Sequence, residues 1–306
     1  MLAVVSPGQG AQSPGMLIPW LEVEAFAASL ARSSEATGLD LAHLGTQADA
    51  DTIRDTAIAQ PLLVATALAS AHALRAAGIG QAAVVAGHSV GEFAAAALAG
   101  VITDEEAMRL VTVRGTAMAQ AAAASEPTSM AAVLGGDPDE VLAAIAALGL
   151  TAANVNGAGQ VVAAGAKDAI AALVATPPLK ARVVELQVAG AFHTTYMAPA
   201  VDALQAAAAQ VTPANPGVVL LSNKDGQAVT TGADAVARLV GQVANPVRWD
   251  LCMEAIAAHG VTGMVELAPG GVLTGLAKRA LKEIPAVPLK SPADLDAART
   301  LAQEVA

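Results

Sequence analysis

Residues 83–100 of the chain have the sequence AVVAGHSVGEFAAAALAG. A run of small apolar residues leads into Gly87-His88-Ser89-Val90-Gly91, and an alanine-rich stretch with helical character follows. Gly-x-Ser-x-Gly between a buried strand and a helix is the pattern of a nucleophile elbow, a turn so tight that small residues must flank the serine. The pattern therefore predicts a strand over 83–86, a helix over 90–99 and Ser89 as an exposed nucleophile.

The residue after the serine has a predicted role of its own. The N–H group of Val90 would point toward the position of an oxyanion, where the helix dipole also favours negative charge. The alternative for the same pattern is a serine N-cap between two packing glycines. The flanking strand and helix favour the elbow.

Outside this stretch, short apolar runs alternate with helical patterns. Strands are expected at 2–5 and 218–221, and helices at 58–77, 103–124 and 194–209, with a helical pattern also running up to Leu30. Thr103 and Glu106 have the spacing of a capping box at the start of one of these helices. Strands followed by helices imply an α/β protein with a mostly parallel sheet that is covered on both faces.

Between about residues 129 and 188 the order of elements changes. Strands are predicted at 130–134, 151–155, 160–164 and 182–188, and helices at 138–147 and 167–174, with Asn156-Gly157 between the two middle strands. The order βαββαβ is that of a ferredoxin-like unit. We therefore expect a small domain over 129–189, inserted into a large catalytic domain formed by 1–128 and 190–306.

Composition excludes several classes of protein. The 306 residues are 55% hydrophobic and carry a formal net charge of -11, which argues against a nucleic-acid partner. Polar residues interrupt the most apolar long segment, 59–79, so a buried helix is expected there and no membrane span. The first residues lack a basic region and reach Pro7 early, so no signal peptide is expected. With Cys252 as the single cysteine, the chain is expected to be cytoplasmic.

A serine nucleophile needs a base, and the chain has five histidines. His43 and His259 lie in surface contexts, and His88 lies directly beside the serine. His72, in a helix that looks buried, is expected to be a core histidine. His193 follows the last strand of the insert at a domain junction, where loops tend to meet a cleft, and is the best candidate. No acidic residue between Ser89 and His193, Glu92 included, stands at a strand end as the acid of a hydrolase triad should.

Seven motifs occur along nearly the whole chain: SPGQG at 6–10, AQP at 59–61, GHSVGE at 87–92, VRG at 113–115, NVNG at 154–157, AFHT at 191–194 and NPVRW at 245–249. In order and spacing they resemble those of the malonyl-CoA:acyl-carrier-protein transacylases. The resemblance implies an α/β-hydrolase-like large domain with a ferredoxin-like insert. It implies a transferase that uses malonyl-CoA and the phosphopantetheine thiol of acyl carrier protein, with no further cofactor and no metal.

The resemblance also implies roles for individual residues. Ser89 matches the nucleophile and His193 the base of a ping-pong reaction, and the backbone N–H of Gln9 matches the donor that completes the oxyanion hole with Val90. Gln242 matches the residue whose backbone carbonyl orients the histidine in place of a triad carboxylate.

Four more positions match residues at the acyl-binding end of the site. Arg114 matches the arginine that holds the malonyl carboxylate, although sequence alone favours an exposed helix arginine. Phe192, in AFHT, resembles the malonyl-selective pattern, whereas relatives that accept methylmalonyl units carry a smaller residue. Gln60 and Asn156 match positions near the site.

Other functions stay open at this stage. A discrete malonyl acyltransferase of polyketide synthesis would have the same motifs, and a serine esterase or thioesterase would share the elbow. The carrier protein is usually acidic, so its binding to this acidic chain requires a local basic patch. The candidates are Lys278, Arg279 and Lys282 on one helix, and Lys180 with Arg182 at the edge of the insert; solvated surface charge is the alternative for both.

Overall fold

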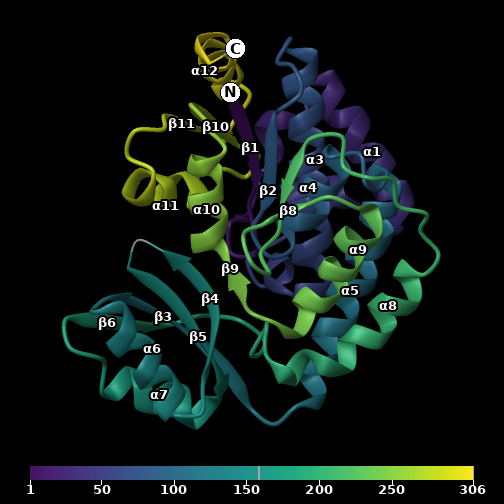
Figure 1. Cartoon of the computed structure of the whole chain (residues 1–306). Helices are drawn as coiled ribbons and strands as arrows, with labels where there is room; N and C mark the ends of the chain where they lie inside the picture. The colour runs from purple at the N-terminus through teal and green to yellow at the C-terminus, as the bar shows by residue number, and fades with distance from the viewer. Residues whose placement is uncertain (158, 306) are drawn as a thin grey trace.

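The computed structural model describes residues 1–157 and 159–305, and its larger sheet has six strands (Figure 1). Their order is β11 (Ala286–Pro288), β10 (Gly263–Glu266), β1 (Leu2–Ser6), β2 (Val84–Gly87), β7 (Val219–Leu221) and β8 (Ala228–Val229). All neighbours are parallel except β7 and β8, which form an antiparallel pair. The mostly parallel sheet expected from the alternating pattern is therefore present.

The two faces of this sheet bury two separate apolar clusters. Along β1, Leu2 and Val4 belong to one cluster while Ala3 and Val5 belong to the other, as the alternation of side chains in a strand requires. The second face is covered by α10 (Trp249–Ala258) and α11 (Val272–Ala280). The larger cluster gathers most of the other helices around the first face: α1 (Glu24–Thr37), α2 (Leu41–Thr46), α3 (Thr56–Ala76), α4 (Gly91–Leu98), α5 (Asp104–Ala124), α8 (Val201–Ala208), α9 (Gly232–Gly241) and α12 (Asp294–Glu304).

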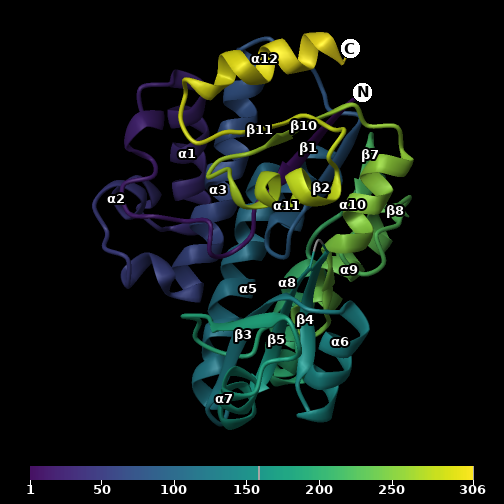
Figure 2. The same ribbon diagram turned by 90° about the vertical axis from the view of Figure 1, so that its left-hand side faces the viewer.

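A second, antiparallel sheet lies below the first in both views (Figures 1 and 2). It is built from β3 (Thr128–Gly135), α6 (Pro138–Ala147), β4 (Thr151–Gly157), β5 (Gln160–Ala166), α7 (Lys167–Ala175) and β6 (Ala181–Glu185). The spatial order is β6-β3-β5-β4, and the expected βαββαβ sequence of elements is confirmed. A fifth strand, β9 (Val247–Arg248), joins parallel to β4 from a distant part of the chain, which the sequence did not predict.

Several predicted boundaries were wrong. Asn156 and Gly157 belong to β4 instead of the turn after it, and β6 ends at Glu185 instead of residue 188. The predicted helix 194–209 is a 3-10 helix, η3 (Thr195–Ala200), followed by α8; Pro199, which has no N–H to donate, lies inside η3 near its end. The helical pattern expected up to Leu30 continues to Thr37, where Gly38 ends it in the left-handed region.

Helix α3 is long and apolar enough to cross a membrane, by its length and composition alone. In this fold 83% of its most apolar 18-residue window is buried inside the protein, so the helix serves as a core element. The capping box at the start of α5 is confirmed, with Thr103 and Glu106 each accepting from the other's backbone N–H. The described residues also form three further short 3-10 helices: η1 (Ile18–Trp20), η2 (Thr52–Arg54) and η4 (Gln242–Ala244).

Candidate active site

The turn between β2 and α4 has the geometry of an elbow. Ser89 has a backbone φ of 53°, in the left-handed region that residues with a Cβ seldom adopt. A Cβ on Gly87 would lie 2.0 Å from the backbone carbon of Gly91, and one on Gly91 would lie 2.3 Å from the carbonyl oxygen of Ser6. Both glycines are therefore required by close backbone contacts, which explains the small residues on either side of the serine.

His193 is the histidine that the fold brings to this serine. Its Nε2 lies 2.7 Å from the Oγ of Ser89, and its Nδ1 lies 2.9 Å from the backbone carbonyl oxygen of Gln242. The carbonyl can only accept, so Nδ1 carries the proton and Nε2 is free to accept one from the hydroxyl. In the described residues, no carboxylate forms a hydrogen bond or ion pair with His193, in agreement with the missing triad acid.

Burial keeps this imidazole neutral. Desolvation, with a smaller contribution from the nearby Arg114 cation, lowers the pKa of His193 to about 3. The backbone carbonyl of Gln242 opposes the shift by accepting from Nδ1. His193 is therefore in the form that can accept a proton throughout the neutral pH range.

Two backbone N–H groups near the serine donate no hydrogen bond within the described part of the chain. They are those of Gln9, in the loop after β1, and Val90, at the N-cap of α4. The side chain of Gln9 is turned to the hydroxyl of Thr56, 3.4 Å away. Unpaired N–H groups at a helix start favour an anionic ligand, as the predicted oxyanion hole requires.

Arg114, on α5, is buried with 1% of its surface exposed, so the sequence-based alternative of a surface arginine is wrong. Its Nη1 donates to the Oε1 of Gln60 at 2.6 Å, and its Nη2 donates to the Oε1 of Gln242 at 3.0 Å. Nη2 also lies 3.5 Å from the Oγ of Ser89, and the guanidinium carbon lies 5.8 Å from the centre of the Phe93 ring.

This arginine is a buried cation whose hydrogen-bond acceptors are neutral. Its Nε has no partner among the described residues, and desolvation lowers the pKa of Arg114 to about 10, so the group stays charged at neutral pH. A buried guanidinium held by two amides, beside a serine hydroxyl, is suited to bind a carboxylate through charge-assisted hydrogen bonds.

A cavity of about 440 Å³ opens beside the serine, between the two sheets. Ser89, His193 and Gln60 line it, together with Phe192, which is 6% exposed. The N-terminal loop, the smaller sheet and α11 form most of the other walls. The loop contributes Gly8, Gln9, Gly10 and Gln12, the sheet contributes Met130, Ala132, Asn154, Asn156, Gln160 and Val162, and α11 contributes Val272, Leu273 and Leu276.

Asn156 reaches the cavity from β4 and contacts the elbow through His88. Its Oδ1 lies 2.8 Å from the Nε2 of His88, and its Nδ2 donates to the side chain of Gln160 at 3.4 Å. His88 packs edge-on against Trp249, with ring centres 5.8 Å apart. His88 thus joins the smaller sheet to the elbow, a role that the sequence did not indicate.

The remaining histidines and the cysteine lie outside this constellation. His43 and His259 are exposed, as expected. His72 is not a core residue: its ring is 30% exposed and pairs with Asp104 at 2.7 Å. Cys252 is fully buried, and burial raises the pKa of its thiol, so it is unsuited to be a nucleophile. No cluster of three metal-ligating side chains occurs in residues 1–157 and 159–305.

Sequence reasoning missed two buried residues that support the site. The side chain of Asn223, just after β7, accepts from the N–H of Ser89 at 2.7 Å and donates to the carbonyl of Gly87 at 2.8 Å. Glu92, which the sequence indicated only as an acid not placed at a strand end, is 4% exposed and accepts from the N–H of Asn223 at 2.6 Å. The one sequence feature that could have indicated the burial of Glu92 is its position as a charged residue in the otherwise apolar helix after the elbow.

Comparison with known proteins gives one consistent result. The family model of the acyl transferase domain matches residues 4–301. A malonyl CoA-acyl carrier protein transacylase of Mycobacterium tuberculosis is 52% identical over 298 residues, which are 97% of this chain and 98% of the relative. One from Escherichia coli is 36% identical over 306 residues, which are 98% of this chain and 99% of the relative.

Solved structures agree with this result. The crystal structure of the Mycobacterium tuberculosis enzyme superposes with a TM-score of 0.93, covering 97% of this chain and 99% of that one. A malonyl-transacylase solved with its type II polyketide acyl-carrier protein is 32% identical and has a TM-score of 0.90, covering 97% of this chain and 98% of that one.

Proposed function

The chain belongs to the acyl transferase family, and from this premise we propose that it transfers a malonyl group from malonyl-CoA to the phosphopantetheine thiol of an acyl carrier protein. The observation that carries the proposal is the buried cation of Arg114 beside the Ser89–His193 pair. A serine and histidine alone serve many acyl transfers. A buried arginine 3.5 Å from the nucleophile selects an acyl group with a free carboxylate.

The reaction is a ping-pong transfer in two half-reactions. The Oγ of Ser89 attacks the thioester carbonyl of malonyl-CoA while its proton passes to the Nε2 of His193. The carbon–sulfur bond breaks, and the CoA thiolate leaves with the proton that His193 returns. In the second half-reaction His193 takes the proton of the carrier thiol and the sulfur attacks the carbonyl carbon of the malonyl ester. The bond between that carbon and the Oγ of Ser89 then breaks, and His193 returns the proton to the Oγ.

Two N–H groups stabilise the tetrahedral intermediates of both half-reactions. Those of Gln9 and Val90 donate to no other atom in the described residues, so neither must give up a bond when the oxyanion forms. Removing one such donor from an acyl-transfer enzyme typically costs about 10²- to 10³-fold in rate.

Residues around the acyl group complete the proposed site. Gln60 and Gln242 each hold one arm of Arg114, and the malonyl carboxylate would bind at the Nη2 side, which faces the Oγ of Ser89. Phe192, next to the base, limits the space at the acyl α-carbon. Asn156 lines the wall formed by the smaller sheet, where an extended pantetheine arm would pass.

We place the reaction in fatty-acid chain elongation, in the cytoplasm, with no cofactor beyond the two substrates and no nucleic-acid or membrane partner. A discrete acyltransferase of polyketide synthesis is the second candidate, because this chain also resembles a transacylase solved with a polyketide carrier protein. A serine esterase or thioesterase is disfavoured, since a buried arginine at the serine has no use with neutral acyl groups.

We assign the larger sheet and its helices to an α/β-hydrolase-like catalytic domain over 1–128 and 190–306. The βαββαβ unit is a ferredoxin-like insert over 129–189, whose strand order β6-β3-β5-β4 is the one that such units have. The cavity between the two sheets is then an interdomain site, which is a common position for ligand pockets.

The carrier protein is proposed to dock beside α11. This helix lines the cavity with Leu273 and Leu276, and Lys278 and Arg279 in its last turn are exposed. Lys282 follows within one turn and is also exposed. An acidic carrier that contacts these three charges would lie at the side of the cavity.

Mass spectrometry after brief incubation with malonyl-CoA tests the function. The wild type should gain one malonyl group, and Ser89→Ala should gain none while keeping its fold, because the change removes only a hydroxyl. Transfer of the label to a carrier protein, and not to water, separates a transferase from a thioesterase. A malonyl adduct on the Ser89→Ala variant would disprove the assignment of the nucleophile.

A further inference from the structure

Glu92 lies in the first turn of α4, three residues after the nucleophile, and is 4% exposed. Its two carboxylate oxygens accept from different partners: Oε1 from the backbone N–H of Asn223 at 2.6 Å, and Oε2 from the Nε2 of Gln242. A buried carboxylate needs such partners because the loss of hydration is costly. Each of these two partners is itself hydrogen-bonded to a residue of the candidate site.

The first partner leads to the nucleophile. The side chain of Asn223 accepts from the N–H of Ser89 at 2.7 Å and donates to the carbonyl of Gly87 at 2.8 Å, and its Oδ1 also accepts from the Nε2 of Gln242 at 3.1 Å. The position of its backbone, held by Glu92, therefore sets the position of the turn that presents Ser89.

The second partner leads to the base and to the arginine. The backbone carbonyl of Gln242 accepts from His193, and its side-chain oxygen accepts from Arg114 at 3.0 Å. Its Nε2 donates to Glu92 and lies 3.1 Å from the carbonyl of Ser89. Gln242 thus contacts the nucleophile, the base and the cation, and Glu92, together with the Oδ1 of Asn223, holds its Nε2 and so the direction of its amide.

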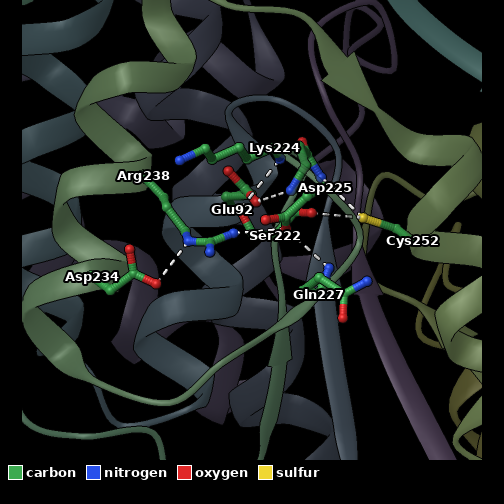
Figure 3. Close-up of polar contacts among 9 residues, drawn as sticks. Glu92, Ser222, Lys224, Asp225, Gln227, Asp234, Arg238 and Cys252 are labelled. Carbon is green, nitrogen blue, oxygen red and sulfur yellow. Dashed lines mark hydrogen bonds and ion pairs between the residues drawn. The ribbon is translucent and has the colours of Figure 1, made fainter.

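The other charges around Glu92 are already satisfied or distant from the site. Arg238, from α9, is held by Asp225 at 2.7 Å and Asp234 at 2.8 Å, as Figure 3 shows. Cys252, from α10, is a buried thiol with a raised pKa, so it is neutral. The remaining facing charge is Arg114, which Glu92 reaches through the amide of Gln242.

We propose that Glu92 is a positioning residue that aligns Ser89, His193 and Arg114 through two buried amides, those of Asn223 and Gln242. The proposal deepens the function given above and rests on it for the role of Arg114. The alignment of Ser89 with His193 is independent of the substrate and can be tested separately.

The geometry requires an ionised carboxylate at this position. The backbone N–H of Asn223 and the Nε2 of Gln242 both donate to Glu92, with the hydroxyl of Ser222 also facing it, and a carboxylate offers the two N–H groups an acceptor each. A glutamine at position 92 would oppose one of them with its own NH₂ group. Turning the amide of Gln242 to relieve that contact would aim its NH₂ at the guanidinium of Arg114, so the conflict cannot be removed without disturbing the site.

Labelling of Ser89 by a small alkyl fluorophosphonate, followed by mass spectrometry, tests the alignment without using malonyl-CoA. We expect Glu92→Gln to slow labelling by about tenfold or more, because misaligned reacting groups lose their proximity advantage. The matched control is Thr103→Ala, which removes the N-cap of α5 and touches no residue of the site. It should be destabilised but labelled at the wild-type rate. Equal labelling of Glu92→Gln and wild type would overturn the proposal.

The pH dependence of the wild type gives a test that needs no variant. Burial raises the pKa of Glu92 to about 7, whereas His193 stays neutral down to about 3. Labelling should therefore decline as the pH falls through about 7, and Glu92→Gln should lack this decline. A wild-type rate that stays constant from about pH 8 to about pH 5 would also overturn the proposal.

The two proposals can fail separately. If malonyl-CoA leaves no adduct but fluorophosphonate labelling depends on Glu92, the substrate is wrong and the positioning role holds. If malonyl transfer occurs and labelling ignores Glu92, the function holds and the positioning role is wrong.

Discussion

The Oγ of Ser89 lies 2.7 Å from the Nε2 of His193, although 104 residues separate them in the chain. Both residues have a left-handed backbone, with φ of 53° and 59°. A residue with a Cβ pays about 1–2 kcal/mol for that conformation. Both side chains are thus presented by strained turns, and the strain is tolerated because surrounding contacts fix the backbone at each end.

Replacing the base should slow acylation far more than it destabilises the protein. We expect His193→Ala to reduce the rate of malonyl adduct formation by about 10²- to 10⁴-fold, the usual value of general-base help. Quenched-flow mass spectrometry measures the rate, and circular dichroism checks the fold. A reduction of less than about tenfold would point to another base.

Removing the buried cation should change which acyl donor is preferred. Charged hydrogen bonds contribute about 1.5–3 kcal/mol, so Arg114→Ala should lower kcat/KM for malonyl-CoA by roughly 10- to 150-fold relative to acetyl-CoA. Arg114→Lys should recover only part of the loss, because an ammonium cannot reach Gln60, Gln242 and a carboxylate together. Equal use of malonyl-CoA and acetyl-CoA by the wild type would contradict this role.

Enlarging the acyl pocket should admit a branched donor. Phe192 lines the cavity beside the base, and overpacking by one methyl group costs about 1–3 kcal/mol. Phe192→Ser should therefore raise the methylmalonyl-to-malonyl ratio of kcat/KM by roughly 5- to 150-fold. Competition between the two donors in one reaction, read by mass spectrometry, measures the ratio directly. An unchanged ratio means that selectivity is set elsewhere.

Reversing the charge at the end of α11 should affect the carrier protein alone. Lys278→Glu with Arg279→Glu should raise KM for the carrier and leave KM for malonyl-CoA unchanged, because exposed charges act over roughly 8 Å at physiological ionic strength. Lys180→Glu with Arg182→Glu, at the edge of the smaller sheet, is the matched comparison. If the comparison pair has the larger effect, the carrier docks there.

Folding stability should report the ionisation of Glu92. Its pKa rises from 4.5 in the unfolded chain to about 7 in the folded one, so the folded protein binds the extra proton between these values. Its contribution to stability is complete below about pH 4.5 and is lost as the pH rises through about 7. Wild type should therefore gain about 1.4 kcal/mol per pH unit over Glu92→Gln on acidification within this window.

Urea unfolding of both proteins at several pH values measures that difference. His88 and His193 have lowered pKa values and act in the opposite direction, but they are present in both proteins and cancel. A difference that does not vary between about pH 4.5 and about pH 7 would mean that the pKa of Glu92 is the same in the folded and unfolded chain.

Local signals predicted most of the fold. Helix α6 begins and ends as predicted because Asp137 caps it and Pro138 fits its first turn. The elbow was equally visible in the sequence because its two glycines flank the serine, although Gly91 packs against Ser6 from a distant part of the chain. The order and spacing of the family motifs then identified His193, Arg114 and Gln242. Hydrophobic periodicity predicts only local structure and could not have shown that these residues meet.

Long-range contacts are what the sequence did not reveal. Glu92 and Asn223 are hydrogen-bonded although 131 residues separate them, and no local sequence pattern near either residue predicts this contact. The burial of Arg114 depends on Gln60 and Gln242, which come from different elements. Strand β9 is two residues long, too short to give an alternating pattern, and it exists because β4 offers a free edge.

Because of strand β9, residues 129–189 are poorly suited to be exchanged on their own between related proteins. Asn154 pairs with Val247, five residues after Gln242. The smaller sheet is therefore hydrogen-bonded to the segment that orients the base. A chimera that takes only residues 129–189 from a relative would keep the old β9 against a new β4. Crossover points for recombination should therefore move residues 242–249 together with the insert, as one discontinuous block.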